Sequence, residues 1–107
     1  MARLVVNREG VDLVTHELVG EVITIGSAPL NHIVIDNPAV SAQHAMLVRV
    51  GDSYRLKDLR STNGTQVNGV SITDAELHDG DKIHFGSAVA IFAGSCRKGD
   101  QTDMLGE

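Results

Sequence analysis

Short apolar runs, separated at close intervals by turn-forming residues, constrain this chain more than any other feature. No stretch keeps apolar residues at the 3.6-residue spacing of an amphipathic helix for long enough to predict one. Aromatic residues make up only 3% of the chain, so the core must consist mainly of Val, Ile, Leu and Ala, which favours strands. In the first half, we expect strands at Leu4–Val6, Val11–Val14, Val22–Ile25 and Ile33–Ile35. Arg8-Glu9-Gly10 lies between the first two of these strands and predicts a hairpin.

The second half shows the two-residue alternation of half-buried strands. Tyr54 and Leu56 would face one side while the charged residues beside them face the other, and Ile83 and Phe85 repeat the pattern. Asn68-Gly69 lies between two short apolar runs and predicts a type I′ hairpin, because both turn positions need a positive φ. Gly86-Ser87 predicts a tight turn between the last two strands.

These elements predict a single all-β domain. A chain of 107 residues has room for one core rather than two. Many short strands favour an antiparallel β-sandwich or barrel, with its loops gathered at the two ends. We expect this domain at residues 1–94, and a flexible tail or linker at residues 95–107, where neither alternation nor a core pattern is present.

Charge and cysteine content exclude several classes of partner and location. The formal net charge is −5, and no cluster of basic residues is available to neutralise a nucleic-acid backbone. No apolar run approaches the roughly 20 residues of a membrane-spanning helix. Cys96 is the only cysteine, so no intrachain disulfide is expected, and a reducing cytoplasm fits best. We therefore expect a cytoplasmic protein with neither a nucleic acid nor a membrane as its partner.

The residues that catalysis or metal binding requires are not grouped in the sequence. Ser41 and His44 are close, but nothing marks the orienting carboxylate and oxyanion hole that acyl transfer needs. The five histidines lack metal-ligand spacing, and one cysteine cannot build a structural zinc site. We expect no enzymatic activity, no cofactor and no metal.

Small polar residues are concentrated in three loops, at residues 26–32, 36–44 and 60–69. Their hydroxyls, amides and glycines suit an anion or a peptide, because glycine lets backbone N–H groups approach a ligand. Each of these residue types is also a common turn former, so any single one indicates a turn before it indicates a site.

Together the loops match an ordered set of motifs. These are Gly26, Ser41 with His44, Asp58-Leu59-Arg60-Ser61-Thr62-Asn63-Gly64-Thr65, Val67-Asn68-Gly69 and Leu77-His78-Asp79-Gly80-Asp81. In order and spacing the chain resembles the forkhead-associated domain family from about Leu4 to Phe92. The resemblance implies an eleven-stranded β-sandwich that binds phosphothreonine peptides with the loops at one end.

The resemblance also implies roles for individual residues. Ser41 and Thr62 would hold the phosphate, and Asn63 would hold the backbone of the peptide. The family's phosphate-binding arginine is absent, because Ser27 occupies its position, and Ala42 follows the loop serine where a polar residue is usual. The residues expected to support the loops are Gly26, His44, Gly64 and Asn68.

The missing arginine predicts weakened dependence on phosphate. A charge-assisted hydrogen bond contributes roughly 1.5–3 kcal/mol, or about ten- to a hundredfold in affinity. Arg60 is the one strong cation in the three loops and would supply charge if it points into the cleft, while His32 would do so in part under acidic conditions.

Two hypotheses therefore remain open for the function. The first is a module that recognises a phosphothreonine-containing or unphosphorylated peptide through these loops. The second is a phospho-independent scaffold or homodimerisation domain that uses a sheet face or an edge strand. An outward-pointing Arg60 would favour the second.

Overall fold

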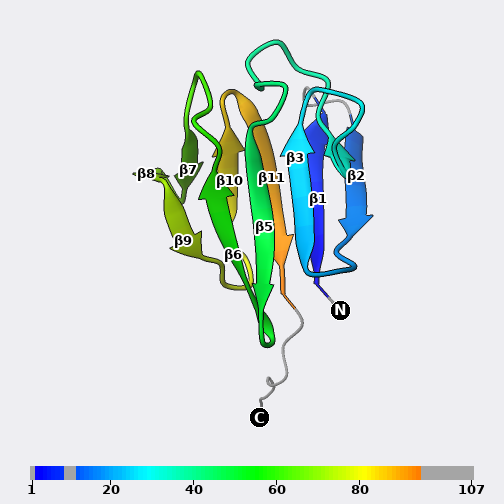
Figure 1. Cartoon of the computed structure of the whole chain (residues 1–107), viewed down its shortest axis with the longest axis vertical. Coiled ribbons are helices and arrows are strands. Elements are labelled where there is room, and N and C mark those ends of the chain that lie inside the picture. Colours follow the sequence, from blue (N-terminus) through cyan, green and yellow to red (C-terminus); the bar gives the residue numbers. More distant parts are fainter. Residues whose placement is uncertain (1, 9–11, 95–107) are drawn as a thin grey trace.

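The computed structural model describes residues 2–8 and 12–94, and these residues form eleven strands in two packed sheets (Figure 1). Residues 1 and 9–11, and residues 95–107, where a flexible tail or linker is predicted, lie outside the described residues. The strands are β1 (Arg3–Arg8), β2 (Asp12–Glu17), β3 (Val22–Gly26), β4 (Ile33–Val34), β5 (Ala45–Val50), β6 (Ser53–Asp58), β7 (Thr65–Val67), β8 (Val70–Ile72), β9 (Asp74–Glu76), β10 (Lys82–Phe85) and β11 (Ala88–Ala93).

The two sheets contain different numbers of strands. The six-stranded sheet runs β2-β1-β11-β10-β7-β8, and the five-stranded sheet runs β4-β3-β5-β6-β9. Among the described strands, neighbouring pairs are antiparallel except β3 and β4, which are parallel and pair Ile25 with Ile33. The predicted all-β sandwich is confirmed, with this one parallel pair added.

The predicted hairpins are confirmed by their register. In the first, β1 pairs with β2 and places Val6 opposite Val14. In the second, β7 pairs with β8, and Asn68 and Gly69 have φ values of 53° and 86°, as a type I′ turn requires. Gly86, with a φ of 63°, begins the turn that joins β10 to β11.

The core lies between the sheets and follows the alternation of the sequence. Tyr54 and Leu56 on β6, and Ile83 and Phe85 on β10, are buried, while their neighbours in the same strands are less so. Branched aliphatic side chains and three aromatic rings fill the space. Among the described residues, only His44 and Thr65 are polar and buried, and both lie at the loop end described below.

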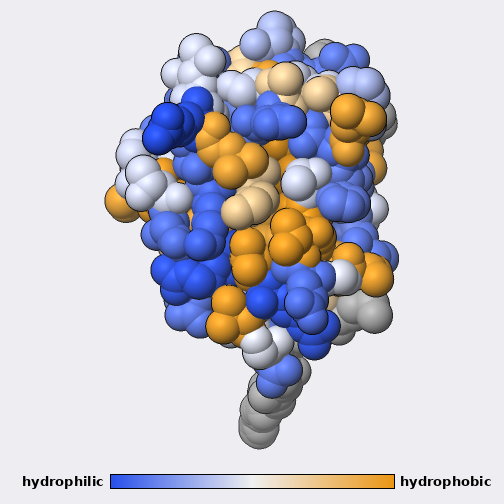
Figure 2. Space-filling view, viewed as in Figure 1, coloured by the Kyte–Doolittle hydropathy of each residue, from blue (hydrophilic) through white to orange (hydrophobic). Residues whose placement is uncertain are grey.

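The outer face of the five-stranded sheet divides into two parts (Figure 2). Hydrophilic side chains cover β6 and β9, where Arg55 and Lys57 pair with Asp74. Apolar side chains cover β3 and β5, and Val22 and Val50 are among the exposed ones. In residues 2–8 and 12–94, no helix has the length and apolar character needed to cross a membrane.

Candidate functional site

Three loops lie together at one end of the sandwich, shown uppermost in Figure 1. They are the β3–β4 loop (residues 27–32), the β4–β5 loop (residues 35–44) and the β6–β7 loop (residues 59–64). The turn from β10 to β11 lies at the same end. Hydrogen bonds between the loops, rather than regular secondary structure, hold this end of the domain together.

The β3–β4 loop runs alongside the β4–β5 loop. The backbone amide of Ser27 donates to the carbonyl oxygen of Ser41 over 3.0 Å. Gly26 allows this approach, because a Cβ atom there would lie 2.2 Å from the carbonyl oxygen of Ala42. Asn31 completes the contact by donating from Nδ2 to that same carbonyl oxygen over 2.7 Å. Ala42 thus contributes through its backbone, and Ser27 lies directly beside Ser41.

The β4–β5 loop is joined in turn to the β6–β7 loop. The hydroxyl oxygen of Ser41 accepts a hydrogen bond from the backbone amide of Thr62 over 3.0 Å. Asn63 donates from Nδ2 to the carbonyl oxygen of Ala39 over 2.8 Å. Thr62 and Asn63 are exposed and Ser41 is half-buried, so these three polar side chains form one surface.

His44 is fully buried beneath that surface. Its Nδ1 accepts from the backbone amide of Ser41 over 3.1 Å, and its Nε2 lies 2.9 Å from the carbonyl oxygen of Gly64. A backbone N–H can only donate and a carbonyl can only accept, so these partners assign the hydrogen to Nε2. The ring meets Phe85 edge to face, with centroids 5.6 Å apart. His44 therefore links two loops to the core.

Asp58 closes the base of the β6–β7 loop. Its carboxylate accepts from the hydroxyls of Ser61 and Thr65 over 2.5 and 2.7 Å and from the Ser61 amide over 3.2 Å. Partial burial alone would raise the pKa of Asp58, but the hydrogen bonds from Ser61 and Thr65 outweigh it and lower the pKa below its ordinary value. The loop is therefore held by an ionised carboxylate.

Two glycines allow the β10–β11 turn to brace the loops. Gly64, with a φ of 83°, presents its carbonyl oxygen to His44 and also to the amide of Gly86, 3.2 Å away. Gly86 has no room for a side chain, because a Cβ atom would lie 2.3 Å from the carbonyl oxygen of Ala39.

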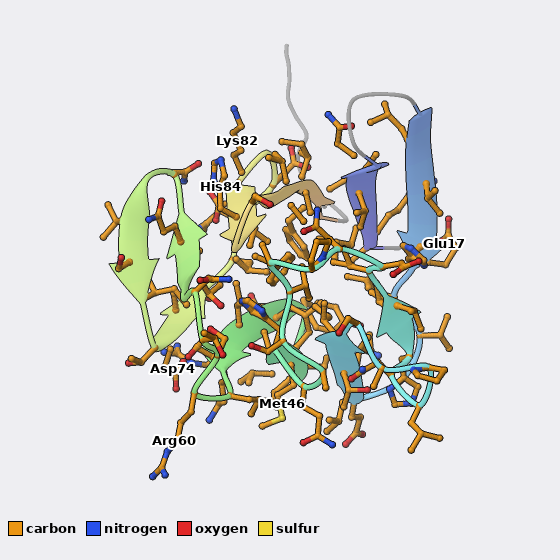
Figure 3. All side chains as sticks on the ribbon, turned by 90° about the horizontal axis from the view of Figure 1, so that it is seen from above. Glu17, Met46, Arg60, Asp74, Lys82 and His84 are labelled. Carbon is orange, nitrogen blue, oxygen red and sulfur yellow. The ribbon has the colours of Figure 1, made fainter. Side chains whose placement is uncertain are left out.

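Three residues singled out in the sequence lie outside the surface formed by Ser41, Thr62 and Asn63. Arg60 is exposed, has a φ of 57° and points away from the body of the domain (Figure 3). His32 is held against Thr24, whose amide donates to His32 Nδ1 over 3.0 Å. Asn68 lies at the other end of β10, where its amide group bonds Asp81 and Lys82. Asn68 thus supports the turn before β10 and not the three loops.

The sequence alone predicts no site role for Asn31 or Asp58, and it predicts only a turn at Gly86. The Asp58-x-x-Ser61 spacing was a usable signal, because Asp side chains commonly accept hydrogen bonds from nearby backbone amides in turns. The contacts of Asn31 with Ala42 and of Gly86 with Ala39 join distant segments, and no local pattern predicts them. Within the described part of the chain, no three His, Cys, Asp or Glu side chains are grouped to hold a metal ion.

Known proteins are similar to this chain in sequence and in fold. The chain is 42% identical over 79 residues to the ABC transporter ATP-binding/permease protein Rv1747 of Mycobacterium tuberculosis, covering 74% of this chain and 9% of that protein. It is 36% identical over 72 residues to the oxoglutarate dehydrogenase inhibitor of Corynebacterium jeikeium, covering 67% of this chain and 50% of that protein. The matched regions thus span half or less of these two relatives.

A solved structure from a structural and functional analysis of phosphothreonine-dependent FHA domain interactions superposes with a TM-score of 0.80. It is 26% identical, and the match covers 88% of this chain and 98% of that one. The sequence profile of the FHA domain matches residues 23–86, which is more than half of the chain and includes all three loops. This chain therefore belongs to the forkhead-associated (FHA) domain family.

Proposed function

We propose that this domain binds a phosphothreonine-containing peptide of a partner protein through the three loops, with weak dependence on the phosphate. The observation that carries the proposal is the hydrogen bond between Ser41 and Thr62, which brings two hydroxyl side chains from separate loops to one surface. The similarity to a structure studied for phosphothreonine-dependent FHA interactions supports the same assignment.

The hydrogen-bonding capacity of this surface suits an anionic ligand. The Ser41 oxygen accepts from the Thr62 amide, so the Ser41 hydroxyl proton is available to donate elsewhere. In the described chain, the Thr62 hydroxyl makes no hydrogen bond, and Asn63 uses only one of its amide hydrogens, toward Ala39. A phosphate would accept from the two hydroxyls, while Asn63 would pair with the backbone of the peptide.

The charge of the surface predicts modest affinity. The β3–β4 and β4–β5 loops contain no Lys or Arg, and Arg60 points away from them (Figure 3). The phosphate would therefore lack a charge-assisted hydrogen bond, which contributes roughly 1.5–3 kcal/mol. We expect an affinity about ten- to a hundredfold below that of a site with an arginine at position 27.

The domain acts, in this proposal, by binding rather than by catalysis. Forkhead-associated domains are interaction modules. Ser41 accepts from a backbone amide and His44 is occupied by Ser41 and Gly64, so His44 is not placed to take a proton from the serine hydroxyl. The single cysteine agrees with a cytoplasmic setting.

Fluorescence polarisation with a diverse set of matched phosphothreonine and unphosphorylated peptides tests the proposal. Thr62→Val should weaken the best phosphopeptide about tenfold, because one hydroxyl donor to an anion is lost. Thr15→Val is the matched control, since Thr15 is an exposed threonine on β2 in the six-stranded sheet, away from the loops, and it should leave binding unchanged. Equal, negligible binding of both peptide sets by the parent domain would contradict the proposal.

A phospho-independent scaffold or homodimer is the second candidate function. The outward direction of Arg60 favours it, as does the apolar area over β3 and β5 that includes Val22 and Val50 (Figures 2 and 3). Sedimentation equilibrium of the parent and Val50→Asp domains tests homodimerisation through this face. A dimer that Val50→Asp dissociates would support it, and a monomer in both would contradict it.

A further inference from the structure

Two of the five asparagines in the sequence precede a glycine, Asn63 in the β6–β7 loop and Asn68 in the β7–β8 hairpin. An Asn-Gly step is the most reactive sequence for spontaneous deamidation, because glycine has no side chain to keep its backbone nitrogen from the preceding amide carbon. Both asparagines are exposed. From the sequence alone the two Asn-Gly dipeptides should be equally reactive, and only their surroundings in the folded domain distinguish them.

We propose that Asn63 is a site of spontaneous deamidation in the folded domain and that Asn68 is protected. In this reaction the backbone nitrogen of Gly64 attacks Cγ of Asn63, forming an N–C bond. The Cγ–Nδ2 bond breaks, and ammonia leaves with the proton from the Gly64 nitrogen. Water then opens the five-membered succinimide at either carbonyl, which produces aspartate or isoaspartate at position 63.

The side chain of Asn68 is held at both of its polar atoms. Its Nδ2 donates to the carboxylate of Asp81 over 2.9 Å, and its Oδ1 accepts from the amide of Lys82 over 3.0 Å. Its backbone amide also donates to the carbonyl oxygen of Lys82 over 2.7 Å. Attack by Gly69 requires the side chain to rotate toward the following residue, so these bonds must break first.

Asn63 is held at one side-chain atom only. Its Nδ2 donates to the carbonyl oxygen of Ala39, and within residues 2–8 and 12–94 its Oδ1 has no partner. No hydrogen bond of the Gly64 nitrogen is present in the same part of the chain, and a Cβ atom added at Gly64 would meet open space. One neutral hydrogen bond therefore opposes the reaction at Asn63, against two at Asn68, one of them to a carboxylate.

The consequence for the loop surface rests on the proposed function. Deamidation replaces the Nδ2 donor to Ala39 with a carboxylate, which adds a negative charge beside Ser41 and Thr62. That charge would repel a phosphate and leave the Ala39 carbonyl without its partner. The modified domain should therefore bind a phosphopeptide at least about tenfold more weakly.

The test compares the full chain folded and unfolded. The chain is incubated at mildly alkaline pH, either in buffer or in guanidinium chloride, and the peptide that contains both asparagines is sequenced by mass spectrometry over time. In buffer, Asn63 should convert about tenfold or more faster than Asn68, because Asn68 must also release a charge-assisted bond. In guanidinium chloride the two should convert at similar rates, since the structural protection is gone.

Substitutions at the two asparagines show which residue gives rise to the deamidation product, and this test requires no ligand. Asn63→Gln should abolish the early product in buffer, while Asn68→Gln should leave it, and an isoaspartyl methyltransferase assay should detect the isoaspartate. Equal rates at the two positions in buffer, faster conversion at Asn68, or no conversion at Asn63 would each overturn the proposal. None of these readouts depends on peptide binding, so failure of the proposed function would be seen separately.

Discussion

The hydroxyl oxygen of Ser41 accepts a hydrogen bond from the backbone amide of Thr62, over 3.0 Å and across 21 positions of the sequence. The contact joins the β4–β5 loop to the β6–β7 loop, and the amide of Ser27 bonds the carbonyl oxygen of Ser41 on the other side. The three positions that the family resemblance assigns to phosphate are therefore neighbours. What they lack is a cation.

Ser27→Arg should create or strengthen phosphothreonine binding by about ten- to a hundredfold, because a guanidinium can donate two hydrogen bonds to a phosphate. The gain should shrink with added salt, since the loop end is open to solvent. Fluorescence polarisation of matched phosphorylated and unphosphorylated peptides measures it. Ser71→Arg adds the same charge at an exposed position on β8 and serves as the control. A gain of the same size in both variants would show that the position of the charge does not matter.

Asn63→Ala should weaken a bound peptide by about tenfold, because backbone groups of the peptide would lose a partner. The variant also loses the bond to Ala39, so we expect a loss of about 1 kcal/mol in the free energy of unfolding. Binding assays and denaturant titration measure the two effects separately. Unchanged binding, together with reduced stability, would assign Asn63 a purely structural role.

Gly26→Ala should destabilise the domain by roughly 1–3 kcal/mol or more, because the added Cβ atom would lie 2.2 Å from the carbonyl oxygen of Ala42. Gly20→Ala is the comparison, since Gly20 has open space around it and a φ of 102°, so only backbone strain of about 1 kcal/mol is expected. Thermal unfolding ranks the two variants. A smaller loss at Gly26 would show that the β4–β5 loop can move away without cost.

Acid should lower the stability of the domain over two separate pH ranges. Burial lowers the pKa of His16 from its ordinary 6.5, so the unfolded chain binds this proton more tightly and stability falls as the pH drops below about 6.5. The lowered pKa of Asp58 adds a second loss below its ordinary 3.8, which reaches completion only as the carboxylate is protonated in the folded state. Denaturant titration at a series of pH values should show that His16→Gln removes the first loss of stability and keeps the second.

A chain that ends at Gly94 should fold as the parent does. The last strand, β11, ends at Ala93, and Gly94 is held by the carboxylate of Asp79 through its backbone amide at 3.0 Å. Residues 95–107 contain too few apolar residues to repay the entropy of ordering them. A markedly lower melting temperature for the shortened chain would show that these residues belong to the domain.

The local pattern of the sequence determined the fold class and most of its strands. Alternation at Tyr54 and Leu56 indicated which side chains face the core, because successive side chains of a strand point to opposite faces. Asn68-Gly69 indicated a hairpin, because few other residues adopt a positive φ at two successive positions. The motif order around Ser41 and Thr62 was likewise sufficient to identify the family.

Only the tertiary structure decided how the loops are joined and which way their side chains point. The residues near Gly26 in the sequence do not predict its contact with Ala42, and those near Gly86 do not predict its contact with Ala39. These contacts depend on how the two sheets pack. The sequence predicts Arg60 as a source of charge for the site if it points into the cleft, yet in the structure its side chain points away from the domain (Figure 3). The two Asn-Gly steps are identical as dipeptides, and it is the Asp81 carboxylate and the Lys82 amide, brought beside Asn68 by folding, that separate them. Local residue preferences act over a few positions, whereas a binding surface made of several loops is set by contacts between segments that only the folded chain brings together.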